Sequence, residues 1–357
     1  PCRLPAVAIH TVGAGGGSVG WVDAGGALRV GPRSAGATPG PACYGKGGRE
    51  PAVTDANLML GRLDPEVRLA GSLPVRLEAA RATLGRVGEH LGLTPEAVAM
   101  GMVEVVETVM FRAVRRVSVE EGSDPRRAVL VAFGGAGGMH ATALARRLDM
   151  AGVVVPPFAG VFSALGLLLS PPRADAARTV LLTRDRSSGL DGAVAGVAAQ
   201  AEAELRGFGS GAPRAVTTLV DARYRGQSPE TAVRYRPGDG WDALEASFHE
   251  AHRIRNGFAR PGDPVEAVTV RAEAVGEPAL RWGELPEITP RGQSRQGDRQ
   301  VLTGDGPVTA GVWWRPGLGP GDEVVGPAVI EEPEATTYLA AGETATVHPS
   351  GTLQVEW

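Results

Sequence analysis

Two glycine-rich stretches are the parts of this chain best suited to chemistry. The first, GAGGGS, spans residues 13–18, and the second, GGAGG, spans residues 134–138. Each follows an apolar run that predicts a strand, so each begins where a strand ends. Glycine has no Cβ, so backbone N–H groups in such a loop can approach phosphate oxygens closely. Glycine clusters also form tight turns and permit close packing, so both interpretations stand.

Neither stretch matches a familiar nucleotide-binding motif. No Gly-Lys-Ser/Thr follows either one, which excludes a Walker loop, and residues 13–18 lack the downstream helix of a dinucleotide fingerprint. Phosphate binding here would therefore need a different fold.

Polar residues near the first stretch are the candidate catalytic groups. His10 ends the predicted strand and could orient a phosphate or a substrate, with a hydrogen-bonded structural histidine as the alternative. Asp55 and Asn57, in VTDANL, offer a carboxylate and an amide for positioning a metal or a water. Asp55 also suits the cap of the helix that begins there. We take His10, Asp55 and Asn57 as the candidate catalytic residues, and the sequence leaves any metal site unknown.

Other reactive side chains favour structural roles. His140 follows the second stretch at a helix start, where capping or packing is the leading interpretation. His249 and His252 are three residues apart, but no third ligand is evident, so they predict no zinc site. Cys43 has no histidine nearby in sequence and is expected to be a small buried thiol.

Composition limits the class of protein. The chain has 357 residues, of which 43% are hydrophobic and 21% charged, and this length predicts two domains. A net charge of −4 argues against nucleic acid or an anionic membrane as the main partner. Only two cysteines are present, which fits a reducing cytoplasm, and no apolar run approaches the roughly 20 residues that cross a bilayer. We therefore expect a cytoplasmic protein with small-molecule and protein partners.

The order of predicted elements indicates an α/β first domain over residues 1–172. Short strands, glycine loops and helices alternate there, including a helix at about 94–121 and a strand at 128–133. The second domain, residues 173–357, is mixed and strand-rich towards its end. Its predicted elements are a helix at 189–205, strands at 215–224, 265–275, 324–330 and 344–347, and a polar surface loop at 281–301.

Several long motifs resemble the hydantoinase A and 5-oxoprolinase family. They are HTVGAGGGSVGW from His10, VAFGGAGGMHA from Val131, RYRGQ from Arg223 and GPAVIEE from Gly326. The resemblance covers nearly the whole chain and includes N-methylhydantoinases and acetone or acetophenone carboxylase subunits. It implies the second half of an actin, sugar-kinase and chaperone-like ATPase fold, followed by a mixed, strand-rich α+β C-terminal domain. Glu331 and Glu332 in the last motif are expected to be solvated or interface charges.

The resemblance also implies cofactor-binding residues for ATP with Mg²⁺. In the first stretch, Gly15, Gly16, Gly17 and Ser18 resemble a second phosphate loop. In the second stretch, Gly134, Gly135, Ala136 and Gly137 resemble an adenosine loop. The first phosphate loop of such folds is not found before His10, so the chain resembles the later part of a subunit whose amino-terminal half is missing. Gly138 stands where many relatives have proline, and its extra backbone freedom is expected to weaken nucleotide packing.

The implied activity is ATP-dependent hydrolysis of the C–N bond of a cyclic amide such as hydantoin or 5-oxoproline. Transfer of the γ-phosphoryl group to the carbonyl oxygen creates a leaving group that water can displace, and such transfer depends on positioning and charge neutralisation. The implied partner is a hydantoinase B type subunit in a hetero-oligomer, and this chain alone is expected to be inactive. The alternatives are a subunit of an ATP-dependent ketone carboxylase and a non-catalytic nucleotide-binding subunit.

Overall fold

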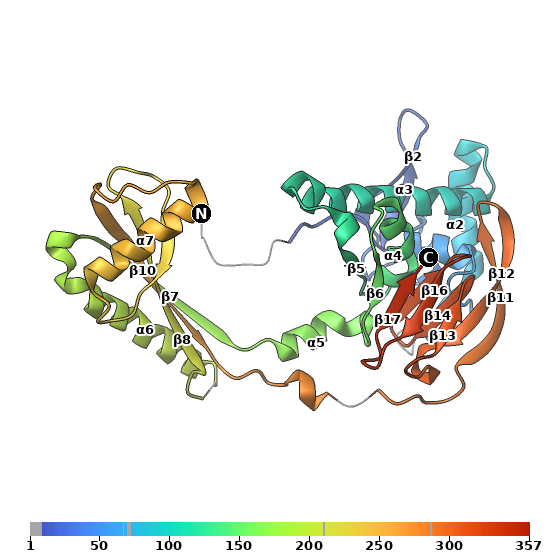
Figure 1. Cartoon of the computed structure of the whole chain (residues 1–357). Helices are drawn as coiled ribbons and strands as arrows, with labels where there is room; N and C mark the ends of the chain where they lie inside the picture. The colour runs from blue at the N-terminus through green and yellow to red at the C-terminus, as the bar shows by residue number, and fades with distance from the viewer. Residues whose placement is uncertain (1–8, 67, 70–72, 210, 286–287) are drawn as a thin grey trace. The chain divides into compact units, whose positions relative to one another are not determined.

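The computed structural model describes residues 9–66, 68–69, 73–209, 211–285 and 288–357. The chain forms two compact units (Figure 1). Unit 1 comprises Pro1–Ala164 and Pro286–Trp357, and unit 2 is Leu165–Leu285. The sequence instead predicted a boundary after residue 172. The compact units differ from that division because the C-terminal strands pair with strands from the first half of the chain.

A five-stranded sheet joins the two parts of unit 1. Its order is β13-β16-β17-β6-β5, with β5 parallel to β6 and β17 antiparallel to β6. The alternating apolar side chains of β6 and β17 are buried against α4, which explains why these segments of the sequence come together. The bounds are β5 Val129–Val131, β6 Gly152–Val155, β13 Glu323–Val325, β16 Thr344–Val347 and β17 Leu353–Glu356.

The remaining strands of unit 1 form a four-stranded sheet, β11-β12-β14-β15, and two small hairpins. β11 lies where the sequence predicted a surface loop, so that prediction was wrong for this part. β11 is an edge strand in which Val301 is the single fully buried side chain, so its sequence is polar although its backbone is paired. The bounds are β1 Ser18–Val22, β2 Leu28–Ser34, β3 Arg68–Leu69, β4 Leu73–Pro74, β11 Arg295–Thr303, β12 Gly306–Trp314, β14 Ala328–Glu332 and β15 Ala335–Leu339.

The helices of unit 1 support the glycine-rich stretches. α3 begins with Pro95 after Thr94, whose side chain accepts a hydrogen bond from the N–H of Ala97. The predicted helix at 94–121 is thus confirmed up to Val117. α1 packs against α2 and α3, and α4 packs against β15. The bounds are α1 Val53–Met59, α2 Leu77–Leu91, α3 Pro95–Val117, α4 Gly137–Arg147 and α5 Phe162–Leu169, the last of which crosses the division between the units.

Unit 2 is a four-stranded antiparallel sheet of order β7-β10-β8-β9 with two helices that share its core. Burial alternates along β10, because one face of the strand packs on the helices and the other does not. The predicted strands at 215–224 and 265–275 are confirmed with the same bounds, and the helix predicted at 189–205 is α6. The bounds are β7 Arg173–Thr183, α6 Leu190–Gly207, β8 Ala215–Tyr224, β9 Thr231–Arg234, α7 Gly240–Asn256 and β10 Val265–Val275.

Short 3₁₀ helices complete the described chain. They are η1 Ala42–Tyr44, η2 Val119–Glu121, η3 Pro125–Arg127, η4 Ala159–Val161, η5 Arg184–Gly189, η6 Trp282–Glu284 and η7 Arg315–Gly317. Within the described ranges, no helix combines the length and the apolar character needed to cross a membrane.

Candidate functional site

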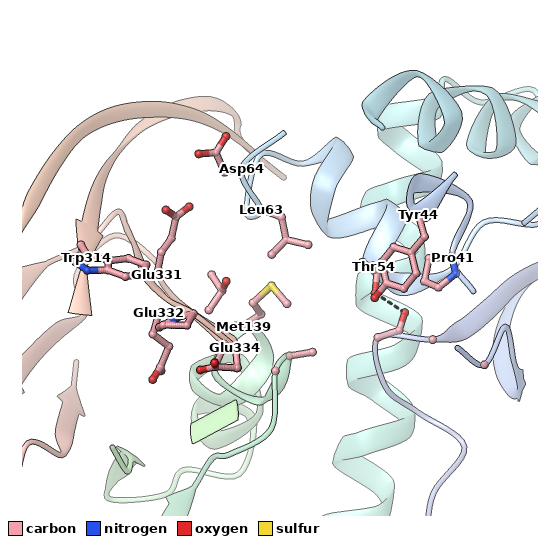
Figure 2. Close-up of a pocket in the computed structure, with 18 residues that line it drawn as sticks. Pro41, Tyr44, Thr54, Leu63, Asp64, Met139, Trp314, Glu331, Glu332 and Glu334 are labelled. Carbon is pink, nitrogen blue, oxygen red and sulfur yellow. Dashed lines mark hydrogen bonds between the residues drawn. The ribbon is translucent and has the colours of Figure 1, made fainter. Parts of the chain in front are cut away.

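Both glycine-rich stretches reach one cavity of about 570 Å³ in unit 1 (Figure 2). Gly16 and Gly17 line it from the first stretch, and Gly135 and Ala136 line it from the second. The turn between β14 and β15 forms another wall. The structure thus brings together two loops that are more than a hundred residues apart in sequence.

The first loop is fixed by its own serine and by α1. Ser18 Oγ accepts a hydrogen bond from the N–H of Gly15 at 3.0 Å and donates one to the carbonyl of Gly13 at 3.3 Å. Thr54, at the start of α1, donates to the carbonyl of Gly16 through its N–H at 2.8 Å and through Oγ1 at 2.9 Å (Figure 2). No described residue accepts a hydrogen bond from the N–H of Gly16 or Gly17. These two amides are therefore available to an anion in the cavity.

The second loop leads from β5 into α4. Gly134 has a φ of +87°, a conformation that favours glycine, and its N–H donates to the carbonyl of Ala159 at 2.7 Å. The carbonyl of Gly135 accepts from the N–H of Thr336 at 3.2 Å, which ties the loop to β15. Among the described residues, the N–H groups of Gly135 and Ala136 have no acceptor. This helix start offers the second pair of free amides at the cavity.

Gly138 packs closely against β15, which the sequence did not predict. A Cβ at this position would lie 2.4 Å from Oγ1 of Thr337 and 2.9 Å from the carbonyl oxygen of Thr336. β15 thus leaves no room for a side chain at position 138.

Carboxylates line the wall of the cavity formed by the β14–β15 turn and the loop after α1. Glu331 binds Arg299 at 2.8 Å, and Arg299 also reaches Asp64 at 3.1 Å. Glu332 binds the buried Arg315 at 2.8 Å. Glu331 and Glu332 were expected to be solvated or interface charges. The first alternative was wrong, because each side chain is largely buried against an arginine.

Burial is the main cause that raises the pKa of both carboxyl groups. For Glu331 it outweighs the opposing effect of Arg299, and the nearby Asp64 raises the pKa further. For Glu332 it outweighs the effect of Arg315. Carboxyl groups with a raised pKa beside a cavity are candidates for accepting or donating a proton in a reaction.

The three predicted catalytic residues do not line this cavity. His10 is exposed and lies outside any helix or strand, and residues 1–8 of the predicted strand before it lie outside the described residues. Asp55 is fully buried and accepts hydrogen bonds from the N–H groups of Ala42, Cys43 and Ala52 at 3.1, 2.7 and 2.7 Å. This geometry agrees with the other role that the sequence offered for Asp55, a cap at the start of α1.

Asn57 is also fully buried within α1. Its Nδ2 donates to the carbonyl of Val53 at 3.1 Å, and its Oδ1 has no partner among the described residues. The catalytic role of His10, Asp55 and Asn57 stays a prediction that these positions do not support.

The other predicted cofactor residues lie beside the cavity. Gly15, Gly134 and Gly137 line an adjacent groove of about 380 Å³ between α3, β5 and α4, which we call the β5 groove. Ser18 is buried and lines neither the cavity nor the β5 groove. His140 lines the β5 groove, and its Nδ1 lies 3.2 Å from Oε1 of the buried Glu107.

The two histidines and the cysteine that were expected to have structural roles are hydrogen-bonded or buried. Nδ1 of His249 contacts the hydroxyl of Tyr224 at 2.8 Å, and Nδ1 of His252 contacts the carbonyl of Phe258 at 2.8 Å. Cys43 is fully buried, and this burial raises the pKa of its thiol. In the described part of the chain, no group of three or more His, Cys, Asp or Glu side chains could hold a metal ion.

The fold is mixed α/β. Two glycine loops line one cavity, and each has N–H groups that could bind an anion there. The chain belongs to the hydantoinase/oxoprolinase family. The hydantoinase/oxoprolinase model matches residues 1–176, and the model of the hydantoinase/oxoprolinase C-terminal domain matches residues 202–351.

Similar proteins include enzymes that act on cyclic amides. The chain is 34% identical to the caprolactamase subunit alpha of Pseudomonas jessenii, over 99% of this chain and 53% of that protein. It is 30% identical to 5-oxoprolinase 1 of Arabidopsis thaliana, over 99% of this chain and 30% of that protein. The chain thus spans about half of the first relative and less of the second.

Solved structures share the fold. The ATP-dependent caprolactamase of Pseudomonas jessenii gives a TM-score of 0.70 at 34% identity, over 97% of this chain and 52% of that chain. A nucleotide-free acetone carboxylase gives a TM-score of 0.86 at 22% identity, also over 97% of this chain and 52% of that chain. The likeness confirms the expected mixed α/β fold class.

Proposed function

We propose that this chain supplies the phosphate-binding part of an ATP-dependent enzyme that opens a cyclic amide. The observation that carries the proposal is the pairing of two glycine loops at one cavity, each with two N–H groups that have no acceptor among the described residues. A volume of about 570 Å³ lies within the range of roughly 300–1,000 Å³ that small-molecule pockets occupy. The names of the relatives support ATP and a lactam as the ligands.

The four free amides suit the phosphate groups of ATP. They belong to Gly16, Gly17, Gly135 and Ala136. Phosphoryl transfer spreads negative charge over the oxygens of the transferred group, and fixed N–H donors stabilise that charge without reorganisation. The loops are fixed by Thr54 and Thr336 through the hydrogen bonds described above.

Glu331 is the best-placed group to accept the proton of a substrate N–H. It lines the cavity, one of its oxygens binds Arg299, and burial raises the pKa of its carboxyl group. As the lactam carbonyl oxygen bonds to the γ-phosphorus and ADP leaves, the N–H proton passes to the carboxylate. Water then adds to the activated carbon, and the C–N bond breaks as Glu331 returns the proton to the departing nitrogen, which leaves an acyl phosphate. A second water hydrolyses this acyl phosphate, releases phosphate and completes ring opening.

Mg²⁺ would arrive with the nucleotide. This ion keeps several waters and needs only one or two protein carboxylates, so it does not require the group of three or more ligands that the described residues lack. Glu334, on the cavity wall, is the carboxylate that would hold it, and the ion would neutralise phosphate charge.

The test is a coupled assay on the enzyme assembled from this chain, the rest of its subunit and a hydantoinase B type partner. Hydantoin, 5-oxoproline and caprolactam are each supplied with ATP, and ADP and ring-opened product are measured together. We expect equal amounts of both with one of these rings. Glu331→Gln should lower kcat at least about 100-fold, whereas Glu323→Gln, at an exposed site on β13, should leave it unchanged.

Two outcomes would contradict the proposal. ADP formation that requires bicarbonate and acetone would assign the chain to a ketone carboxylase. Nucleotide binding without turnover of any substrate would assign it to a non-catalytic subunit.

A further inference from the structure

A second cavity of unit 1, of about 270 Å³, shares one wall with the cavity that the glycine loops line. The shared wall is the turn between β14 and β15, where Glu332, Pro333 and Glu334 line both cavities. The other walls of the second cavity come from residues 157–158, from residues 288–291, from the chain around η7 and from the β16–β17 hairpin. Its volume is just below the roughly 300–1,000 Å³ of most small-molecule pockets, so it suits a small ligand.

Most of the lining of the second cavity is apolar. It includes the side chains of Phe158, Ile288 and Leu318. Phe158 has a φ of +58°, which is a strained conformation for a bulky residue, and it is 42% exposed. An aromatic side chain held in strain and left open beside a cavity is suited to contact with a ligand. The lining therefore favours a ligand with an apolar body.

One pair of charges on this cavity is already satisfied by the protein. Arg315 is buried and binds Glu332 at 2.8 Å through Nη1. Its Nη2 donates to the carbonyls of Val155 and Gly351 at 2.8 and 3.1 Å. This arginine therefore holds the wall together, and the pair adds no net charge for a ligand to balance.

A second pair of charges on the same cavity is open. Arg291 and Glu334 are exposed, and the side chain of neither makes a hydrogen bond or an ion pair with a described residue. The backbone of Arg291 is fixed, because its N–H donates to the carbonyl of Pro316 at 2.6 Å. One free cation and one free carboxylate beside an apolar cavity are complementary to a molecule that carries a carboxylate and an ammonium group on an apolar spacer.

We propose that the second cavity binds a short ω-amino acid. Its carboxylate would bind Arg291, its ammonium group would bind Glu334, and its methylene chain would lie against Phe158. Hydrolysis of a lactam yields such a molecule, because the broken amide becomes a carboxylate and an amine joined by the carbons of the ring. The identification of the ligand as the reaction product therefore rests on the proposed function. Glu334 also lines the other cavity, so the amine and the Mg²⁺ proposed there would bind in turn and not together.

Ligand-observed NMR titrations of the intact chain, without ATP or Mg²⁺, test the proposal. The probes are 6-aminohexanoate, hexanoate and hexylamine, which share a six-carbon chain and differ in their charges. We expect 6-aminohexanoate to bind at least about threefold more tightly than either of the others, because each exposed ion pair contributes up to about fivefold.

Two variants of the cavity separate the two ends of the ligand. Arg291→Gln should weaken 6-aminohexanoate and hexanoate about threefold and leave hexylamine unchanged. Glu334→Gln should weaken 6-aminohexanoate and hexylamine to the same extent and leave hexanoate unchanged. Arg112→Gln and Glu323→Gln are the matched controls, since both residues are exposed in unit 1 and neither lines the second cavity. They should leave all three affinities unchanged.

Three results would overturn the proposal. Absence of 6-aminohexanoate binding at 10 mM, a concentration on the order of that needed for two exposed ion pairs, would show that the cavity takes no such ligand. Equal affinities for the three probes would show that only the apolar lining binds. Binding that neither cavity variant weakens would place the ligand elsewhere on the chain.

These titrations are independent of the coupled assay described above. Binding of 6-aminohexanoate together with failure of the coupled assay would contradict the proposed function but keep the amino-acid site. Ring opening in the coupled assay without binding of 6-aminohexanoate would overturn the amino-acid site alone.

Discussion

Replacing Gly138 by alanine should destabilise unit 1, although alanine is the better helix former. The added Cβ would meet the carbonyl oxygen of Thr336 at 2.9 Å and Cα of Thr337 at 3.0 Å, and both are backbone atoms that cannot rotate away. Overpacking of this kind costs about 1–3 kcal/mol. α4 and β15 would have to move apart, and both border the cavity.

Gly137→Ala is the matched control, one residue earlier in the same helix. A Cβ there meets only the carbonyl carbon of Ala132, at 3.7 Å, which is ordinary contact. Alanine in place of glycine gains about 0.5–1 kcal/mol at either position of the helix, so this gain cancels and the two variants should differ by the overpacking cost of about 1–3 kcal/mol in the free energy of unfolding.

Differential scanning calorimetry measures this difference. For a unit of this size, 1 kcal/mol shifts Tm by about 2–4 °C, so Gly138→Ala should melt roughly 2–12 °C below Gly137→Ala. Equal melting temperatures for the two variants would refute the packing argument and restore backbone freedom as the meaning of this glycine.

Three further predictions concern the buried polar groups. Arg315→Met should cost about 3–5 kcal/mol in urea unfolding, because it leaves the buried Glu332 without its ion pair; a loss below 1 kcal/mol would show that this pair is not important for folding. The folded chain raises the pKa of Glu331 above its ordinary value of 4.5, so its stabilisation is present below pH 4.5 and is lost as pH rises through the folded pKa. Unfolding titrations should therefore show the unaltered chain losing stability relative to Glu331→Gln from pH 4.5 upward, and a constant difference would contradict this. Cys43 is buried and the pKa of its thiol is raised, so it should react with iodoacetamide at least about 100-fold more slowly than a free thiol. Mass spectrometry of its peptide measures the rate. Rapid labelling of the folded chain would argue against a buried thiol.

The sequence predicted those elements whose signals are local. Thr94 and Pro95 mark the start of α3, and the alternating residues of β10 mark a half-buried strand, so both could be read directly. β11 could not, because an edge strand has a polar sequence and its pairing depends on a distant neighbour.

The loops of the candidate site were found from sequence, but its opposite wall was not. Gly16 and Gly135 stand in motifs that resemble a known family. By contrast, Glu331 is largely buried and binds Arg299 of β11, which also reaches Asp64. No local sequence pattern predicts contacts between such distant residues. Asp55 was chosen as a catalytic candidate because it is a carboxylate near a glycine loop in the sequence. In the structure it accepts hydrogen bonds from three backbone N–H groups instead.

Hydrogen exchange of the intact chain with and without ATP tests the nucleotide site most directly. We expect ATP to slow exchange in both glycine loops, at Gly16 and Gly17 and at Gly135 and Ala136, and Gly16→Val to weaken the effect at both by filling the space beside Thr54. Gly196→Ala, on an exposed face of α6 with open space around it, should leave the effect intact. Unchanged exchange in both loops at millimolar ATP would contradict a phosphate-binding cavity.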